Sequence, residues 1–160
     1  MEKNLAAYAL FEGSFITEAP VIDRTVNILM FKDPDDNEYQ ILINRALLEE
    51  DQTPEAWCEQ QIDVQRNQLP GFKPEGKMLT HEIGPARLPV IQIANNFLQD
   101  GKTIRQVQSI IRLPWHSDVN PVQRGLLIFT LRADDEFSEY QRKHYVQVIN
   151  SFDPQTTLPR

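Results

Sequence analysis

The side chains that most often carry out acid–base, nucleophilic or metal chemistry are few in this sequence. Its three histidines, His81, His116 and His144, do not have the usual metal-ligand spacings, and none belongs to an HExxH motif. The one cysteine, Cys58, has Glu59 beside it and no nearby cation, so a reactive thiolate is disfavoured. We therefore expect a packed thiol, satisfied or solvated histidines and no metal site.

The carboxylates and glycines also have simpler explanations than catalysis. The acidic runs 49–51 and 134–136 precede or begin predicted helices, where capping and solvation account for them. The six glycines are scattered as single residues in turns, so the sequence has no glycine-rich phosphate loop. These patterns predict a protein that is not an enzyme and has no catalytic residues or cofactor. An enzyme that uses the acidic residues is retained as an alternative hypothesis.

One predicted helix, residues 53–69, carries amides in the middle of its apolar stripe. At about 100° per residue, three glutamines lie between two apolar edges. The glutamines are Gln61, Gln65 and Gln68, and the edges are Cys58, Ile62 and Leu69 on one side and Trp57 and Val64 on the other. An amide buried without partners costs about 1–3 kcal/mol, so a helix that only packed on a core would carry aliphatic residues there. The pattern raises the question of what these amides bind.

Hydrophobic alternation and turn residues predict the elements that must position these amides. Thr53 is a plausible N-cap and Pro54 suits the first helical position, while Pro70-Gly71 ends this helix. The predicted helices are 53–69 and 134–152, and the predicted strands are 8–15 with a turn at 12–13, 25–31, 39–45, 78–83, 88–98, 102–113 and 125–132. This order predicts an α+β fold, an antiparallel β-sheet with two main helices packed on it, in a single domain over residues 1–160.

Two of the predicted strands mix aliphatic residues with amides on one face, as the helix does. Strand 39–45 offers Gln40, Leu42 and Asn44, and strand 102–113 offers Ile104, Gln106 and Gln108. One interpretation is a solvent-exposed face of an antiparallel sheet, where such alternation is normal. The other interpretation is a binding groove, and both stay open at this stage.

Composition limits the classes of partner. The net charge of −7 and the absence of a clustered basic face argue against nucleic acid. No stretch approaches the roughly 20 apolar residues of a membrane span, so we expect no direct membrane insertion. The N-terminus has no cleavage site or lipid-acceptor cysteine, and a single cysteine needs no oxidising compartment. We expect a mature N-terminus and a cytoplasmic location.

Four short motifs carry a resemblance to a known family. They are RNQLPGFK (66–73), which ends the amide-bearing helix, DRTVNIL (23–29), ILINR (41–45) and RQVQ (105–108). In order and spacing these motifs resemble the Eag-type (EagR-like) effector chaperones of bacterial type VI secretion systems, which are DcrB-like proteins with a PsbP-like α+β fold.

The resemblance implies a cytoplasmic homodimer that cradles the N-terminal transmembrane helices of an Rhs-type or related effector, beside its PAAR region, before export. It places the client-binding groove on Val26, Ile28, Gln40, Leu42, Asn44, Gln61, Gln65, Leu69, Ile104, Gln106 and Gln108. An alternative is a generic DcrB-like or PsbP-like domain that binds another envelope protein or a small ligand.

A mixed surface suits such a client for physical reasons. Aliphatic residues would shield a transmembrane helix from water, at roughly 25 cal/mol per Å² of covered apolar surface. Glutamines would supply the hydrogen bonds that helices exchange in membranes, on average about 0.6 kcal/mol each. Amides would also keep an empty groove hydrated and so limit the exposed apolar patch. This is our hypothesis for the glutamines of the helix.

Overall fold

The computed structural model describes residues 4–117 and 119–154. Two helices and nine strands follow one another along this part of the chain. The strands are β1 (Leu5–Ala9), β2 (Ser14–Glu18), β3 (Asn27–Lys32), β4 (Glu38–Leu47), β5 (Lys73–Pro74), β6 (Leu79–Ile83), β7 (Leu88–Gln99), β8 (Lys102–Arg112) and β9 (Gly125–Asp134), and the helices are α1 (Pro54–Gln68) and α2 (Glu139–Ser151). The predicted α+β class is confirmed.

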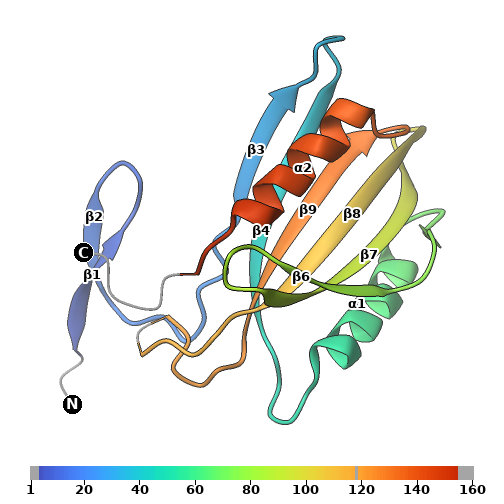
Figure 1. The fold of residues 1–160 in the computed structure, drawn as a ribbon. Helices are drawn as coiled ribbons and strands as arrows, with labels where there is room; N and C mark the ends of the chain where they lie inside the picture. The colour runs from blue at the N-terminus through green and yellow to red at the C-terminus, as the bar shows by residue number, and fades with distance from the viewer. Residues whose placement is uncertain (1–3, 118, 155–160) are drawn as a thin grey trace.

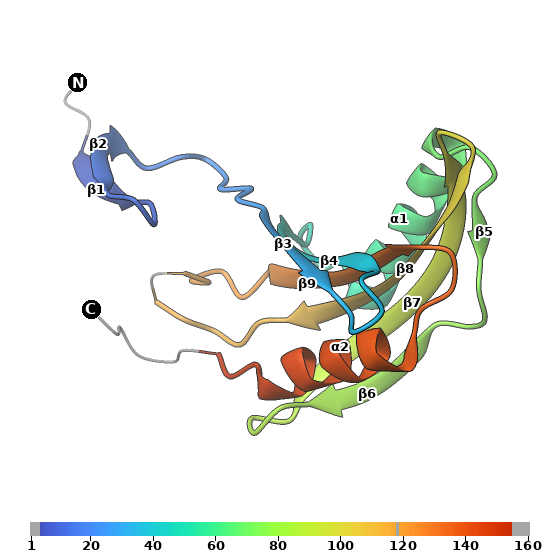
Figure 2. The same ribbon diagram turned by 90° about the horizontal axis from the view of Figure 1, so that it is seen from above.

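Seven of the strands form one antiparallel sheet. Its order is β3-β4-β9-β8-β7-β5, and β6 also pairs with β7. The sheet curves, and the helices lie on opposite faces of it, α2 on one and α1 on the other (Figures 1 and 2). Strands β1 and β2 form a separate two-stranded hairpin that extends away from this body (Figure 2).

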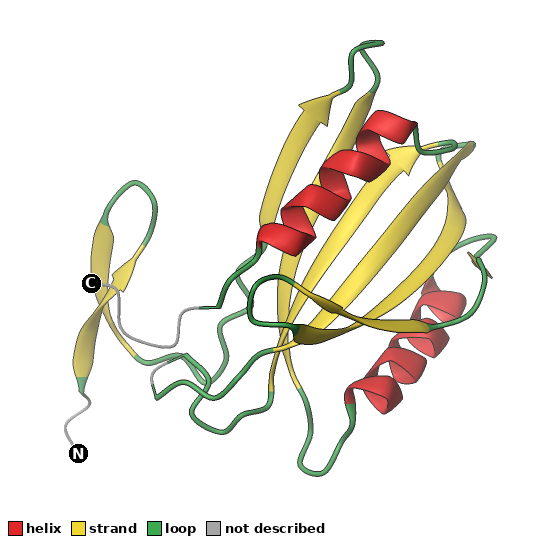
Figure 3. Cartoon of the chain, viewed as in Figure 1, coloured by secondary structure: helices red, strands yellow, loops and turns green. Residues whose placement is uncertain are grey.

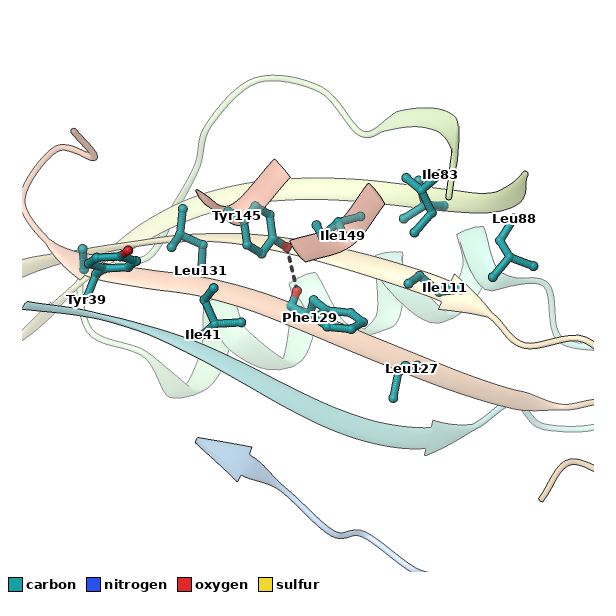
Figure 4. Packing of buried hydrophobic residues seen from close by; sticks show 12 residues of the cluster. Tyr39, Ile41, Ile83, Leu88, Ile111, Leu127, Phe129, Leu131, Tyr145 and Ile149 are labelled. Atoms are coloured by element: carbon teal, nitrogen blue, oxygen red, sulfur yellow. Dashed lines mark hydrogen bonds between the residues drawn. The ribbon is translucent and has the colours of Figure 1, made fainter. Parts of the chain in front are cut away.

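The larger core lies between the sheet and α2. Period-2 alternation sends Ile41 of β4 and Leu131 of β9 to this face, where α2 contributes Tyr145 and Ile149. Burying such side chains contributes about 1.5–3 kcal/mol each. The Tyr145 hydroxyl donates a hydrogen bond to the carbonyl of Phe129 at 3.0 Å, so the buried polar atom is satisfied (Figure 4).

The second core lies between the sheet and α1. Cys58 of α1 is fully buried, and the other buried members of the cluster are Leu48, Ile91, Ile93, Ile110, Leu126 and Ile128. The predicted cap is confirmed, because the Thr53 side chain accepts from the backbone nitrogen of Ala56 at 3.1 Å and Pro54 begins the helix. Burial raises the pKa of the Cys58 thiol to about 12, in accord with a packed thiol.

The structure differs from the predicted elements in four respects. Segment 8–15 contains the end of β1, the turn and the start of β2, and β5 is a strand that the sequence analysis did not predict. Helix α2 begins at Glu139, because β9 extends to Asp134 and Ser138 forms a capping box with Gln141. A short loop separates the strand from the helix (Figure 3). Residues Val64 and Gln68 of α1 are exposed, so the packed stripe of this helix is narrower than predicted.

Within the described residues, neither helix has the length and apolar character needed to cross a membrane.

Candidate binding groove

Strand register brings most of the predicted groove residues to the sheet face that carries α1. Residues paired across neighbouring antiparallel strands project to the same side. One row across the sheet is Ile28, Leu42, Thr130, Gln108 and Ile93, and the next is Met30, Gln40, Arg132, Gln106 and Asn95. Asn44 lies in the row on the other side of the first one, beside Ile128 and Ile110. The strand residues of the hypothesis therefore share one surface.

A line of side-chain hydrogen bonds joins α1 to this surface. The Gln65 amide donates to Oε1 of Gln108 at 3.3 Å and accepts from Nδ2 of Asn95 at 3.3 Å. Gln108 in turn donates to the hydroxyl of Thr130 at 3.4 Å. These bonds explain one of the amides in the stripe of the helix. Gln65 bonds to amide side chains of the sheet beneath it and so avoids the cost of an unpaired buried amide.

The same line of hydrogen bonds continues to the guanidinium of Arg132. Gln106 donates to Oδ1 of Asn95 at 2.9 Å, and its own Oε1 accepts from Nε and Nη2 of Arg132 at 3.3 and 3.0 Å. Burial lowers the pKa of Arg132. In the part of the chain described, no ion pair joins the Arg132 guanidinium to a carboxylate. Its positive charge is instead stabilised by the amide oxygen of Gln106, which accepts two of its hydrogen bonds.

Between α1 and strands β4, β8 and β9 lies a cavity of about 370 Å³. The predicted residues that line it are Asn44, Gln61, Gln65 and Gln108. Ile22 and Arg24, from the segment before β3, also line it. Oδ1 of Asn44 is buried and has no hydrogen-bond partner among the described residues, so it is an acceptor available to a donor that enters the cavity.

The side of this surface nearest β3 is open and apolar. Val26, Ile28 and Met30 are 50, 58 and 59% exposed. Helix α1 lies over β8 at the other side of the face and leaves these residues uncovered (Figure 2). We call the exposed residues of β3, the cavity and the inner side of α1 the groove.

The structure separates the predicted residues into accessible and inaccessible ones. Ile104, Gln106 and Leu42, on the internal strands β8 and β4, are buried. Gln40 and Leu69 are partly buried, the latter at the C-cap of α1. The accessible members are open to solvent, while Gln106 takes part in the hydrogen-bond line.

Three polar residues of this face were missed by the sequence analysis: Asn95, Thr130 and Arg132. Each interrupts an apolar series in its strand, as Asn95 does after Ile91 and Ile93. A polar residue at a core position of a strand is the sequence signal that could have identified them. The partner of such a residue cannot be predicted in the same way, because it depends on strand register.

His144 and Trp115 lie outside the groove. His144 is on the α2 side, where its Nδ1 lies 2.8 Å from the hydroxyl of Tyr39 and its ring meets Phe31 edge-on. Across residues 4–117 and 119–154, no group of three or more His, Cys, Asp or Glu side chains is arranged to hold a metal ion. The exposed Trp115 donates to the carbonyl of Pro121 in the loop between β8 and β9.

A sequence model of the DcrB family matches residues 12–151. The chain belongs to the DcrB family. The match includes the groove and both helices of this DcrB-family protein. It supports the DcrB-like part of the resemblance noted in the sequence.

Two solved structures are similar to this DcrB-family chain to different degrees. PA94 from Pseudomonas aeruginosa, described as a protein of unknown function, has a TM-score of 0.72 and 19% identity, over 96% of this chain and 99% of that one. LpqN from Mycobacterium tuberculosis, described as involved in cell envelope biogenesis, has a TM-score of 0.48 and 18% identity, over 82% and 78%. Comparison with curated proteins gives no match. At this identity PA94 supports the fold alone.

Proposed function

We propose that this DcrB-family protein is a non-enzymatic cytoplasmic chaperone, which binds and shields the N-terminal transmembrane helices of an Rhs or PAAR type VI secretion effector before export, and which acts as a homodimer. The observation that carries the proposal is the groove, where an open apolar rim adjoins a line of hydrogen-bonded amides. A transmembrane helix needs both kinds of contact outside the membrane.

The apolar rim supplies the shielding. Ile28 and Met30 present side chains that are more than half exposed, in line with Leu42 and Gln40 on the next strand. Covering such surface contributes roughly 25 cal/mol per Å² to binding before the cost of association is subtracted. A client helix placed along β3 and α1 would gain this apolar contribution to binding on two of its own sides.

The amides supply polar contacts whose positions are fixed in advance. Gln65 uses one donor and one acceptor in its bonds to the sheet, so an amide of this kind retains a second N–H and a second lone pair. Gln61 lines the cavity beside it, and Asn44 offers its free Oδ1. Polar atoms of a client helix would find partners here without displacing the internal line.

The cavity supports a second candidate function, a DcrB-like domain that binds a small ligand or another envelope protein. Its volume of about 370 Å³ falls within the ~300–1,000 Å³ of typical small-molecule sites. A lone small-molecule site would not need the exposed rim of Ile28 and Met30. We therefore favour a helical client.

The experiment is co-expression with the N-terminal region of an effector encoded beside this protein. We expect the wild type to keep the effector fragment soluble and Leu69→Asp to reduce its soluble amount at least several-fold, because a carboxylate would face the apolar client. Asn67→Asp is the matched control, since it adds the same charge at an exposed position of α1. Equal effector levels with folded Leu69→Asp and wild type would refute this assignment of the surface.

A further inference from the structure

Arg132 places a positive charge on the sheet face that carries the groove. Strand β9 lies between β4 and β8, and Arg132 stands in one row with Gln40 on one side and Gln106 on the other. Met30 of the open rim continues this row on β3. Because α1 lies over β8, the guanidinium is between the apolar rim and the helix, where a client would cover it.

One edge of the guanidinium is occupied within the protein. Nε and Nη2 of Arg132 both donate to Oε1 of Gln106, at 3.3 and 3.0 Å. Gln106 is 2% exposed and donates in turn to Oδ1 of Asn95. Since the guanidinium is planar and rigid, fixing this edge also restrains the direction of the rest of the group.

The opposite end of the guanidinium is free. Arginine has five N–H donors, and the two bonds to Gln106 are those that Arg132 makes with the described residues. In that part of the chain, the buried side-chain nitrogens and oxygens without a partner are Oδ1 of Asn44 and Nε of Arg105, so Nη1 of Arg132 is reached by solvent. One N–H of Nη1 and one of Nη2 therefore form an open edge.

The described carboxylates leave this charge without a counter-ion. Glu38 and Asp134 share the sheet face with Arg132, and both are exposed. Asp134 pairs with Nζ of Lys102 at 3.6 Å, and no described carboxylate forms an ion pair with Arg132. Burial lowers the pKa of Arg132, although a guanidinium stays protonated in proteins. Arg132 is thus a partly buried cation whose free edge faces the groove.

A client that covered the groove would exclude the water that meets this edge. An apolar side chain placed there would leave charged N–H groups without partners, which is strongly unfavourable. Backbone carbonyls in the middle of a client helix are already bonded to N–H groups of the next turn. A carboxylate has two oxygens that match two parallel N–H groups of a guanidinium, so it satisfies both the charge and the geometry.

We propose that Arg132 is a specificity-determining residue of the groove, whose open Nη1–Nη2 edge takes an aspartate or glutamate carboxylate of the client helix. This inference rests on the proposed chaperone function and adds a chemical requirement to it. Acidic residues are rare in transmembrane helices because they are costly there. A groove that needs one discriminates its client from other apolar helices of the same length.

The test uses two synthetic peptides as probes. Both are Leu/Ala helices of about 20 residues with lysines at each end, an acetylated N-terminus and an amidated C-terminus. One carries a single central glutamate and the other carries glutamine, which has nearly the same size and no charge. Because the rest of the sequence is uniform, either helix can shift along the groove to bring its central residue to Arg132.

The wild type is expected to bind the glutamate peptide at least tenfold more tightly than the glutamine peptide in calorimetric titrations without detergent. Arg132→Gln is expected to bind the two peptides alike. Arg142→Gln is the matched control, since it removes the same charge from an exposed position of α2 on the opposite face, and it should keep the preference. Ile28→Asp should weaken both peptides, which places them in the groove.

Equal affinities of the wild type for the two peptides would overturn the inference and leave the groove as a site for apolar helices. This comparison needs no substitution, so it holds even if Arg132→Gln is less stable. A folded Arg132→Gln variant that kept the preference would overturn the assignment to Arg132. Binding of neither peptide would contradict the proposed function and the inference with it.

Discussion

At the scale of single residues, Asp33 shows how one carboxylate joins distant segments. Its Oδ1 accepts from the backbone nitrogens of Asn37 and Asp35 at 2.9 and 3.0 Å, which fixes the turn between β3 and β4. Its Oδ2 accepts from Ser138 and Gln141 at 3.2 Å, at the start of α2. The open rim of the groove and the helix on the opposite face are therefore tied at one side chain.

This arrangement predicts a pH dependence of stability. Hydrogen bonds, first that from the Asn37 backbone, lower the pKa of Asp33 from 3.8. The folded state therefore binds this proton less readily than the unfolded state, so the stabilisation is present above pH 3.8 and is lost as the pH falls through the lower folded value. Asp33→Asn is expected to lose less stability than the wild type between pH 5 and pH 3 in denaturant titrations.

Asp35→Asn serves as the control, since Asp35 lies in the same turn at an exposed position. It is expected to follow the wild-type acid profile. If Asp33→Asn and Asp35→Asn gave the same profile, Asp33 would have no special part in acid stability.

At the scale of elements, α1 is positioned by polar as well as apolar contacts. Cys58 packs into the cluster of Ile93 and Ile110, while Gln65 bridges β7 and β8 through Asn95 and Gln108. Apolar packing fixes the distance between helix and sheet, and hydrogen bonds between amides fix their relative position more narrowly because they are directional. The wall of the groove is therefore held in place without a client.

Gln65→Ala is expected to destabilise the protein by about 1–3 kcal/mol in chemical denaturation, because Asn95 and Gln108 would each lose a partner. The better helix propensity of alanine offsets only a few tenths of a kcal/mol. Gln68→Ala, at an exposed position of the same helix, should be neutral or slightly stabilising. Equal effects of the two substitutions would show that the bridge contributes no stability.

The same elements show which features could be predicted from the sequence and which could not. The start of α1 follows from Thr53 and Pro54, and the hairpin of β3 and β4 follows from a turn of Pro, Asp and Asn, because these signals are local. The partners of Gln65 lie 30 and 43 residues away, so they depend on strand order and register. The sequence indicated a mixed face, and the structure shows which amides bond to one another.

At the scale of the whole molecule, the described residues include apolar surfaces on two elements that stay open. The hairpin of β1 and β2 exposes Leu5 and Ile16, and β3 exposes Ile28 and Met30. In our proposal the client covers the side of β3 that continues into the groove.

The most direct measurement of the central claim is the affinity for a detergent-free fragment that contains the first transmembrane helix of the effector. Titrations would compare the wild type, Ile28→Asp and Leu79→Asp, whose original side chains are 58 and 57% exposed. The account predicts that Ile28→Asp weakens binding at least tenfold, about 1.4 kcal/mol, while Leu79→Asp binds like the wild type. Equal affinity of the wild type and a folded, dimeric Ile28→Asp variant would contradict it.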